Sequence, residues 1–198
     1  MYGYSKAAEN NKAPIAERLA KHLKPGSTVL EIGSGSGQHA IHMASEFPTI
    51  TWLPSERAEV LAILGENLEQ CGANNIHQPL ALDLTDFAWG GDAVDVVYAA
   101  NIMHIVSEDL GKRLIHLAAD ALPPGGLLML YGPYKYNQAF TTESNAAFDQ
   151  WLKTRDSASG IRDYETVTVT AQDAGFIPTF DYAMPANNQI LIFERSDL

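Results

Sequence analysis

The segment from Val29 to Gly37 has the residue types and spacing of a ligand-binding turn. A short apolar run is followed by glycines at alternate positions, and these are Gly33, Gly35 and Gly37. Glycine lets the backbone take positive φ and approach a ligand closely, while the start of the helix expected next offers free N–H groups. A dinucleotide site has the pattern G-x-G-x-x-G, but Gln38 stands where its last glycine belongs. A nicotinamide-dependent oxidoreductase is therefore the weaker interpretation.

The form E-x-G-x-G-x-G, which begins at Glu31, instead resembles motif I of the class I S-adenosylmethionine (SAM) methyltransferases. In that family the methionine part of the cofactor lies in this turn. The resemblance implies cofactor contacts from Glu31, Gly33, Ser34, Gly35 and Gly37. Two other interpretations stay open: the turn is only a tight connection between strand and helix, or Glu31 is a buried, hydrogen-bonded acid that holds it.

Further polar residues stand where other expected strands end. Glu56 lies 25 positions after Glu31, just beyond the second strand, where a carboxylate can accept hydrogen bonds from both ribose hydroxyls. Asp83 and Leu84 end the third strand, where the methyltransferase fold usually contacts the adenine amino group. Asn101 ends the fourth strand, and open α/β sheets bind ligands at the carboxyl ends of their strands. The simpler alternative for each acid is a surface residue or a helix cap.

Strand-like apolar runs alternate with helical patterns, which is typical of a mostly parallel sheet covered by helices on both faces. The expected strands are residues 28–32, 50–53, 78–82, 94–99, 127–131, 178–183 and 189–193. The last two are expected to pair antiparallel through a short connection. We predict one α/β domain over residues 1–198 with the Rossmann-like class I methyltransferase fold, a mostly parallel seven-stranded sheet with an antiparallel last strand.

Helices are expected at residues 57–70, 108–121 and 145–153, and another follows the glycine turn. The first helix of the chain is predicted to carry Pro14 in its first turn, and Pro54 is predicted to stop the second strand. Residues 132–144 are expected to form a loop. Thr166–Thr170 alternates Thr and Val like a strand, but the residues after it resemble a helix end, so we predict a helix.

The chain is similar to a narrower group, the methyltransferase-like 26 proteins, long described as a domain of unknown function. The similarity covers nearly the whole chain, and its strings include residues 7–9, 34–40, 131–134, 144–145 and 184–188. This sequence has Asn10 where the group commonly has Arg, and Glu56 where it commonly has Asp. The resemblance implies SAM as cofactor, with binding positions at Asn11, the glycine turn, Glu56, Asp83 and Asn101, but it supplies no substrate.

Methyl transfer to a phenol, thiol or ammonium group also requires a base. His104, just past the fourth strand, is the candidate because an unperturbed imidazole titrates near pH 6.5; the alternative is a structural histidine. Largely on the strings shared with the group, the acceptor pocket is predicted to be lined by Tyr134, Asn145, Arg162 and Asn187. The leading hypothesis is a SAM-dependent methyltransferase of a small molecule. The alternative is a catalytically silent SAM-binding or protein-docking module.

The charge balance, 13 − 24 = −11, disfavours nucleic acid and anionic membranes as partners. No apolar run approaches the roughly 20 residues of a membrane-spanning helix. A single cysteine, Cys71, and the absence of a signal-like start predict a reducing, cytoplasmic location. No H-E-x-x-H pattern occurs, so no metal is expected. The oligomeric state stays open.

Overall fold

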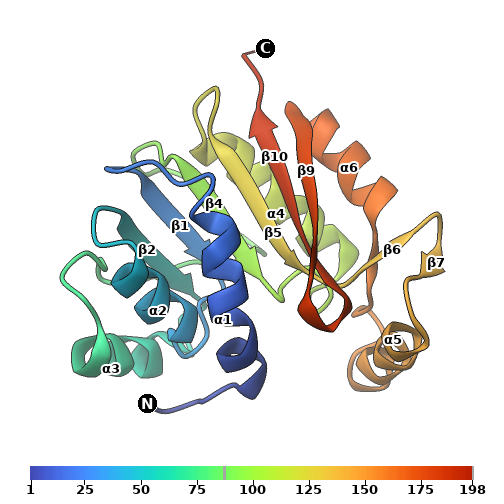
Figure 1. The fold of residues 1–198 in the computed structure, drawn as a ribbon, viewed down its shortest axis with the longest axis horizontal. Coiled ribbons are helices and arrows are strands. Elements are labelled where there is room, and N and C mark those ends of the chain that lie inside the picture. Colours follow the sequence, from blue (N-terminus) through green and yellow to red (C-terminus); the bar gives the residue numbers. More distant parts are fainter. Residues whose placement is uncertain (87, 198) are drawn as a thin grey trace. The chain divides into compact units, whose positions relative to one another are not determined.

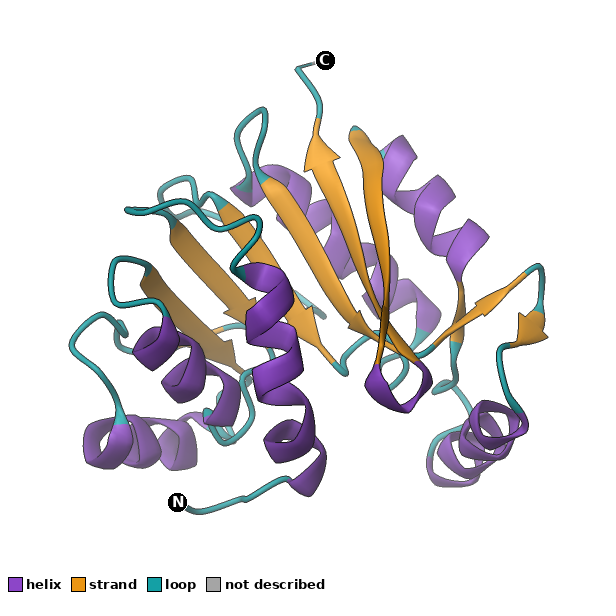
Figure 2. Ribbon diagram, viewed as in Figure 1, coloured by secondary structure: helices purple, strands orange, loops and turns teal. Residues whose placement is uncertain are grey.

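A computed structural model describes residues 1–86 and 88–197, which divide into two compact units. Unit 1 holds the described residues up to 86 together with Val94–Tyr98, and unit 2 holds residues 88–93 and 99–197. Strand β4 (Val96–Ala100) has residues in both units. The strand order is β3-β2-β1-β4-β5-β10-β9, and helices flank the strands of both units (Figures 1 and 2).

In unit 1 the strands run parallel, as the sequence predicts. Strand β1 (Thr28–Ile32) pairs with β2 (Thr51–Glu56), which pairs with the short β3 (Leu80–Ala81). The helices are α1 (Lys6–Leu19), α2 (Gln38–Glu46) and α3 (Leu61–Cys71). Helix α2 follows the glycine turn, so the end of β1 and the start of α2 position that turn.

Helix α1 begins earlier than predicted. It starts at Lys6 rather than next to Pro14, which therefore lies inside the helix. The Ser5 hydroxyl caps the helix by accepting a hydrogen bond from the Ala8 N–H at 3.3 Å. Glu9 in the first turn complements the positive end of the helix dipole. The cap and the charge outweigh the loss of one N–H donor at Pro14, which was wrongly expected to mark the first turn.

Strand β2 continues through Pro54 to Glu56, so the prediction that Pro54 stops it was wrong. The Trp52 N–H donates to the Asn75 carbonyl at 2.8 Å, on the side of β3. Because backbone donors alternate along a strand, the Pro54 nitrogen faces the same side, where pairing with β3 begins only at Ser55. No ladder hydrogen bond is lost there, and Glu56 lies within the strand rather than beyond it.

Unit 2 contains β5, the hairpin β9–β10 and the helices that cover them. Their bounds are α4 (Glu108–Ala121), β5 (Leu127–Gly132), α5 (Glu143–Arg155), α6 (Tyr164–Asp173), β9 (Phe176–Met184) and β10 (Asn188–Arg195). Strand β10 runs antiparallel to both β5 and β9, which confirms the predicted antiparallel last strand. Helix α6 confirms the helix expected at 166–170; its Val167 and Ala171 are buried.

A second, three-stranded sheet occupies part of the segment predicted to be a loop. It has the order β7-β6-β8, formed by β6 (Tyr134–Tyr136), β7 (Ala139–Phe140) and β8 (Arg162–Asp163). Strands of two or three residues are too short to show an alternating pattern in a sequence. The 132–144 loop prediction was therefore wrong, and the new sheet ties Tyr134 to Arg162 as register partners. Among the described residues, no helix is long and apolar enough to cross a membrane.

Replacing Gly37 with alanine is expected to lower the free energy of unfolding by about 1–3 kcal/mol. Gly37 has φ +83°, and an added Cβ would lie 2.9 Å from Leu64 Cδ1. Urea denaturation measures the change. The control is Gly65→Ala inside α3, where a Cβ meets nothing within 4 Å; it is expected to stabilise by up to about 1 kcal/mol. Equal stabilities of the two variants would contradict the left-handed requirement at Gly37.

Candidate cofactor and acceptor sites

The glycine turn after β1 is held in a left-handed conformation and fastened to β2. Gly33, Gly35 and Gly37 have φ values of +73°, +55° and +83°. The Ser34 N–H donates to the Ser55 carbonyl at 2.9 Å, and the Ser55 N–H donates to the Ser34 hydroxyl at 3.2 Å. These reciprocal bonds fix the turn against the end of β2. Beside Gly35 an added Cβ would meet nothing within 4 Å, so this position is open to a ligand.

Glu56 is brought directly to the turn. Its Oε2 accepts a hydrogen bond from the Gly35 N–H at 2.9 Å, and its Oε1 accepts one from the Arg57 N–H at 2.9 Å. A carboxylate offers about four lone-pair positions, so roughly two remain for other donors. The predicted turn and the predicted ribose acceptor thus lie together in unit 1.

Glu31 lies in the interior of unit 1. Only 2% of it is exposed, and its carboxylate accepts a hydrogen bond from Trp52 Nε1 at 2.8 Å. The pKa of Glu31 is raised to about 7, mainly by burial and in part by the nearby Glu56 charge, while the hydrogen bonds from Trp52 and Ser34 oppose the rise. Its carbonyl also accepts from the Ser55 hydroxyl at 2.7 Å. This geometry supports the alternative of a buried acid that holds the turn.

Asn11 stands at one end of a buried polar chain that reaches β4. Its Oδ1 lies 2.7 Å from His39 Nε2, and the Tyr98 hydroxyl lies 3.2 Å from His39 Nδ1. Burial lowers the pKa of His39 to about 4, so its ring is neutral at pH 7. The consistent assignment has His39 donating from Nε2 to Asn11 and accepting from Tyr98 at Nδ1. Asn11 is thereby oriented by α2 and β4.

Asp83 and Leu84 follow β3, as predicted. The Thr85 N–H donates to Asp83 Oδ1 at 2.8 Å, and the hydrogen bonds from Thr85 hold the pKa of this carboxyl below its usual value. Asp83 is therefore ionised and turned back onto its own loop at neutral pH. In the predicted role, the other carboxylate oxygen of Asp83 would accept a hydrogen bond from the adenine amino group.

Two side chains of unit 1 that sequence reasoning missed fasten the N-terminal segment to the glycine turn. Asn67 on α3 is fully buried; it exchanges hydrogen bonds with the Tyr2 N–H and carbonyl at 2.8 Å each and donates to the Ser36 carbonyl at 2.9 Å. Gln38 Oε1 accepts from the Ser5 N–H at 2.5 Å. An asparagine on the same helix face as Leu64 and Leu68 was the available signal for Asn67.

In unit 2, Asn101 and His104 follow β4. Asn101 has φ +59°, unusual for a residue other than glycine, and its N–H donates to the Tyr131 carbonyl at 2.8 Å. His104 is 4% exposed, and its buried Nδ1 has no hydrogen-bond partner. Burial and the Arg162 charge lower the pKa of His104 to about 4. The imidazole is therefore neutral at pH 7, and it is a weaker base than the unperturbed imidazole expected from the sequence.

The residues predicted to line the acceptor pocket form separate contacts within unit 2. Asn145 Nδ2 donates to the Asn187 carbonyl at 3.0 Å, so these two lie together. Arg162 donates from Nε to the Met103 carbonyl at 2.9 Å, beside His104 in the chain. Tyr134 is fully buried, and its hydroxyl has no partner.

Gln189 is a further side chain that the sequence did not indicate. Its buried Oε1 has no hydrogen-bond partner. Gln189 pairs with Gly132 in the β10–β5 register, where an added Cβ would lie 3.3 Å from His104 Nδ1. Opposite residues of an antiparallel pair project to the same face, so Gln189 and His104 face one side of the sheet. Local sequence patterns do not indicate this position of Gln189, because its pairing with Gly132 depends on the register of two strands that are distant in the sequence.

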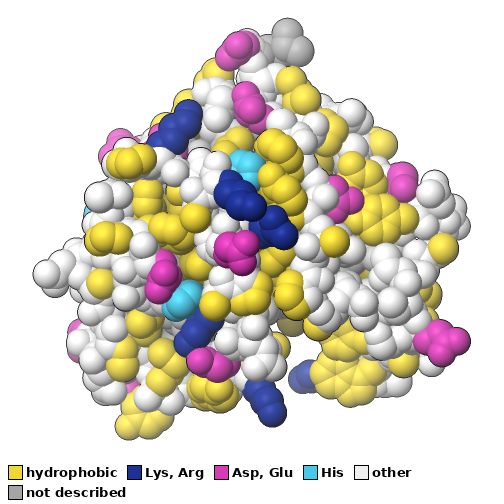
Figure 3. Space-filling model, viewed as in Figure 1, with side chains coloured by type: hydrophobic (Ala, Val, Ile, Leu, Met, Phe, Trp, Pro, Cys, Tyr) yellow, Lys and Arg dark blue, Asp and Glu magenta, His cyan; other side chains and the backbone are white. Residues whose placement is uncertain are grey.

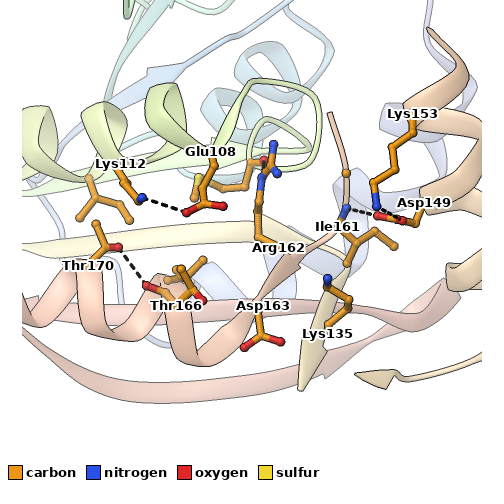
Figure 4. Close-up of a pocket in the computed structure, with 14 residues that line it drawn as sticks. Glu108, Lys112, Lys135, Asp149, Lys153, Ile161, Arg162, Asp163, Thr166 and Thr170 are labelled. Atoms are coloured by element: carbon orange, nitrogen blue, oxygen red, sulfur yellow. Dashed lines mark hydrogen bonds and ion pairs between the residues drawn. The ribbon is translucent and has the colours of Figure 1, made fainter. Parts of the chain in front are cut away.

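Unit 2 also has a partly open cavity of about 250 Å³ between α4, α5, α6, β6 and β8 (Figure 4). Of the predicted acceptor residues, Arg162 lines it. Figure 3 shows one face of the molecule, on which the Asp and Glu side chains lie at separate places rather than in one patch. Within residues 1–86 and 88–197, no group of three or more His, Cys, Asp or Glu side chains could hold a metal ion.

Residues 2–195 match a family model described as a protein of unknown function, DUF938. The chain belongs to the DUF938 family. A curated relative, the ribosomal protein L11 methyltransferase of Desulfosudis oleivorans, is 28% identical over 131 residues, which are 64% of this chain and 41% of that protein.

Several solved structures similar to this DUF938 chain are described as methyltransferases. An O-methyltransferase family protein from Burkholderia thailandensis is 17% identical, with a TM-score of 0.79 over 96% of this chain and 58% of its own. An O-methyltransferase family 2 protein from Planctomyces limnophilus in complex with apigenin is 19% identical, with a TM-score of 0.76 over 96% of this chain and 62% of its own. Human N-acetylserotonin methyltransferase in complex with SAM is 14% identical, with a TM-score of 0.80 over 96% of this chain and 53% of its own.

These likenesses show that the DUF938 chain has the class I methyltransferase fold, as the sequence predicted. The chain spans 41% to 62% of the length of the four proteins compared. The likeness therefore covers the sheet and its helices rather than the whole of those proteins.

Glu31→Gln is expected to remove a pH dependence of stability between about pH 4.5 and pH 7. The folded-state pKa of Glu31 is raised to about 7 from 4.5, so its contribution is fully present below pH 4.5 and is lost as the pH rises through 7. Relative to Glu31→Gln, the wild type is expected to lose roughly 2–3 kcal/mol between pH 5 and pH 8. Urea denaturation at both pH values measures the loss.

Trp52→Phe is the companion variant, because it removes the Nε1 donor that stabilises the ionised Glu31. Its pH transition is expected to move above that of the wild type, in addition to a loss of stability at every pH. A parallel pH profile for wild type and Glu31→Gln would show that Glu31 is ionised in the folded protein throughout this range.

Proposed function

We propose that this chain is a SAM-dependent methyltransferase of a small-molecule acceptor, that it belongs to the methyltransferase-like 26 group, and that residues 1–198 form one methyltransferase domain. The class I fold and the distant methyltransferase relative support the reaction class. The shared strings that include residues 34–40 and 184–188 support the narrower group.

The hydrogen bond between the Gly35 N–H and Glu56 Oε2 is the observation that carries the proposal. It places a carboxylate with unused lone pairs beside an open, left-handed glycine turn at the carboxyl end of β1. Such a pair suits a nucleoside whose ribose hydroxyls donate to the acid. We assign the cofactor to the backbone of Gly33–Gly37 and to Glu56, with Asp83 and Leu84 on the adenine side. Asn11 and Asn101 stay predictions from the sequence.

SAM supplies an activated methyl group when it is bound, so the chain must orient the acceptor, exclude water and take up a proton. His104 is the proposed base. It is buried and neutral at pH 7, and its Nδ1 is without a partner. Gln189 and Tyr134 supply two more buried polar atoms without partners for the acceptor. A polar ligand that paired with these atoms would remove the unfavourable burial of each.

Glu56→Ala is expected to weaken binding of SAM and of its demethylated product by at least about tenfold, because hydrogen bonds to a charged acceptor are lost. Isothermal titration calorimetry measures both ligands. Glu56→Asp keeps the carboxylate and is expected to bind nearly as the wild type does. The exposed Glu59→Ala, three residues further on, is the matched control. Undiminished binding by Glu56→Ala, or no binding by the wild type, would refute this assignment.

His104→Ala is expected to lower turnover by a factor of about 10²–10⁴ while the dissociation constant of SAM stays unchanged. Formation of the demethylated product from labelled SAM, with a small-molecule extract as acceptor source, measures turnover. His116→Ala, an exposed histidine on α4, is the control. Because His104 is neutral above about pH 4, the rate is expected to show no His104 limb near pH 6.5. SAM binding without turnover in any extract would favour the silent SAM-binding module instead.

A further inference from the structure

The cavity in unit 2 is lined by a few apolar side chains and by several charged ones. Its apolar lining comes from Met103, Ile115, Ile161 and Val167. Its charged lining is Glu108, Lys112, Lys135, Asp149, Lys153, Arg162 and Asp163. Four of the seven Lys and Arg residues of unit 2 thus surround one cavity, in a chain whose net charge is −11. At about 250 Å³ it lies below the roughly 300–1,000 Å³ of most ligand pockets, so a small molecule fits it.

The three acids of the lining already have partners. Glu108 pairs with Lys112 at 2.8 Å, and Asp149 pairs with Lys153 at 2.6 Å. Asp149 also accepts from the Ile161 N–H at 2.8 Å. Asp163 Oδ2 accepts from the Gln138 N–H at 2.7 Å, and Figure 4 shows its carboxylate turned away from Arg162.

Lys135 and Arg162 are the two cations of the lining without an ion pair among the described residues. The Lys135 ammonium lies 5.5 Å from the centre of the Phe140 ring. Asp163 is its register partner across β6 and β8, but the two side chains form no ion pair. Lys135 therefore lies at the edge of the cavity near the charges of Asp163 and Glu108 but pairs directly with neither.

Arg162 is held rigidly by neutral groups. Its guanidinium donates to the carbonyls of Met103 at 2.9 Å, of Ala158 at 2.9 Å and of Val106. These carbonyls satisfy N–H groups of Arg162 but carry no charge. Burial lowers the pKa of the half-buried Arg162, and the charges of Glu108 and Asp149 act in the opposite direction. Glu108 and Asp149 act on this half-buried cation without forming an ion pair with it, so a bound anion would supply a closer counter-charge.

We propose that this cavity binds the anionic group of a small organic molecule, a carboxylate or a phosphate, between Lys135 and Arg162. The ammonium of Lys135 and the Nη1 group of Arg162 donate to the anionic oxygens. The body of the ligand packs on Ile115, Ile161 and Val167.

The cavity adjoins the segment that carries His104. Gly160 lines the cavity, and its N–H donates to the His104 carbonyl at 3.0 Å. Arg162 holds the carbonyl of the preceding residue, Met103. An acceptor anchored by its anionic group would thus lie against the His104 backbone. That identification of the ligand as the methyl acceptor rests on the proposed function, whereas anion binding does not.

The whole chain is titrated with 4-hydroxybenzoate, with phenol and with inorganic phosphate. Calorimetry measures the affinity for each compound, and the amide signals of ¹⁵N-labelled protein show where it binds. We expect 4-hydroxybenzoate to bind at least about tenfold more tightly than phenol, which has the same ring without the carboxylate. We expect the shifted amides to include those of Ile161, Thr166 and Thr170, which line the cavity. If phosphate alone shifts these amides, the anionic group is a phosphate and the proposal stands in that form.

Lys135→Met keeps an unbranched side chain, one atom shorter, and removes its charge, so it is expected to weaken anion binding by about tenfold or more. Lys135→Arg is expected to restore it. Lys24→Met, exposed and in unit 1, is the control with the same change of net charge. Equal affinity of wild type and Lys135→Met, binding of phenol as tight as that of 4-hydroxybenzoate, or no shift at the cavity with any anion would overturn the proposal.

SAM is titrated into the same samples to separate the two proposals. Anion binding without SAM binding would refute the proposed methyl transfer and leave the anion site standing. SAM binding without any anion at the cavity would refute the anion site and leave the proposed function standing.

Discussion

The reciprocal hydrogen bonds between Ser34 and Ser55 fix where the glycine turn lies, and the rest of unit 1 depends on that position. They extend the parallel register of β1 and β2 by one step beyond Ile32 and Ser55. Because the turn is fixed at this position, the Gly35 N–H can donate to the carboxylate of Glu56, the next residue of β2 after Ser55. A shift of one residue would turn Glu56 to the other face of the strand, and the turn would lose its acid.

Unit 2 uses Arg162 in a similar way. One guanidinium gathers three carbonyls from the segments around Met103, Val106 and Ala158, so the backbone that carries His104 is fixed by a side chain distant in sequence. Burial is the larger cause of the lowered pKa of His104, and the Arg162 charge adds to it. Arg162 therefore helps to position the segment that carries His104 and helps to keep its imidazole neutral.

The sequence predicted what short-range patterns encode. The glycine turn, the acid 25 positions after Glu31 and the antiparallel final hairpin all follow from local spacing and turn residues. The start of α1 was missed because the cap at Ser5 outweighed Pro14, and β6 to β8 were missed because such short strands carry no periodic signal. Gln189 was missed because its place beside Gly132 depends on the register of two distant strands. The helix face of Asn67 indicated that it is buried, but its bonds to Tyr2 and Ser36 depend on long-range packing.

The interior of unit 1 holds more polar groups beside the turn than stability alone requires. Glu31, His39 and Asn67 are each buried, and an apolar core of equal volume is often as stable as buried polar groups or more so. Every one of them, however, has a hydrogen-bond partner that is also buried or that belongs to the turn's own surroundings. Apolar side chains tolerate several packings, whereas a buried donor must meet its acceptor. The polar groups thus exclude alternative conformations of the turn, and a turn that must meet a ligand through its backbone needs that single conformation more than it needs additional stability.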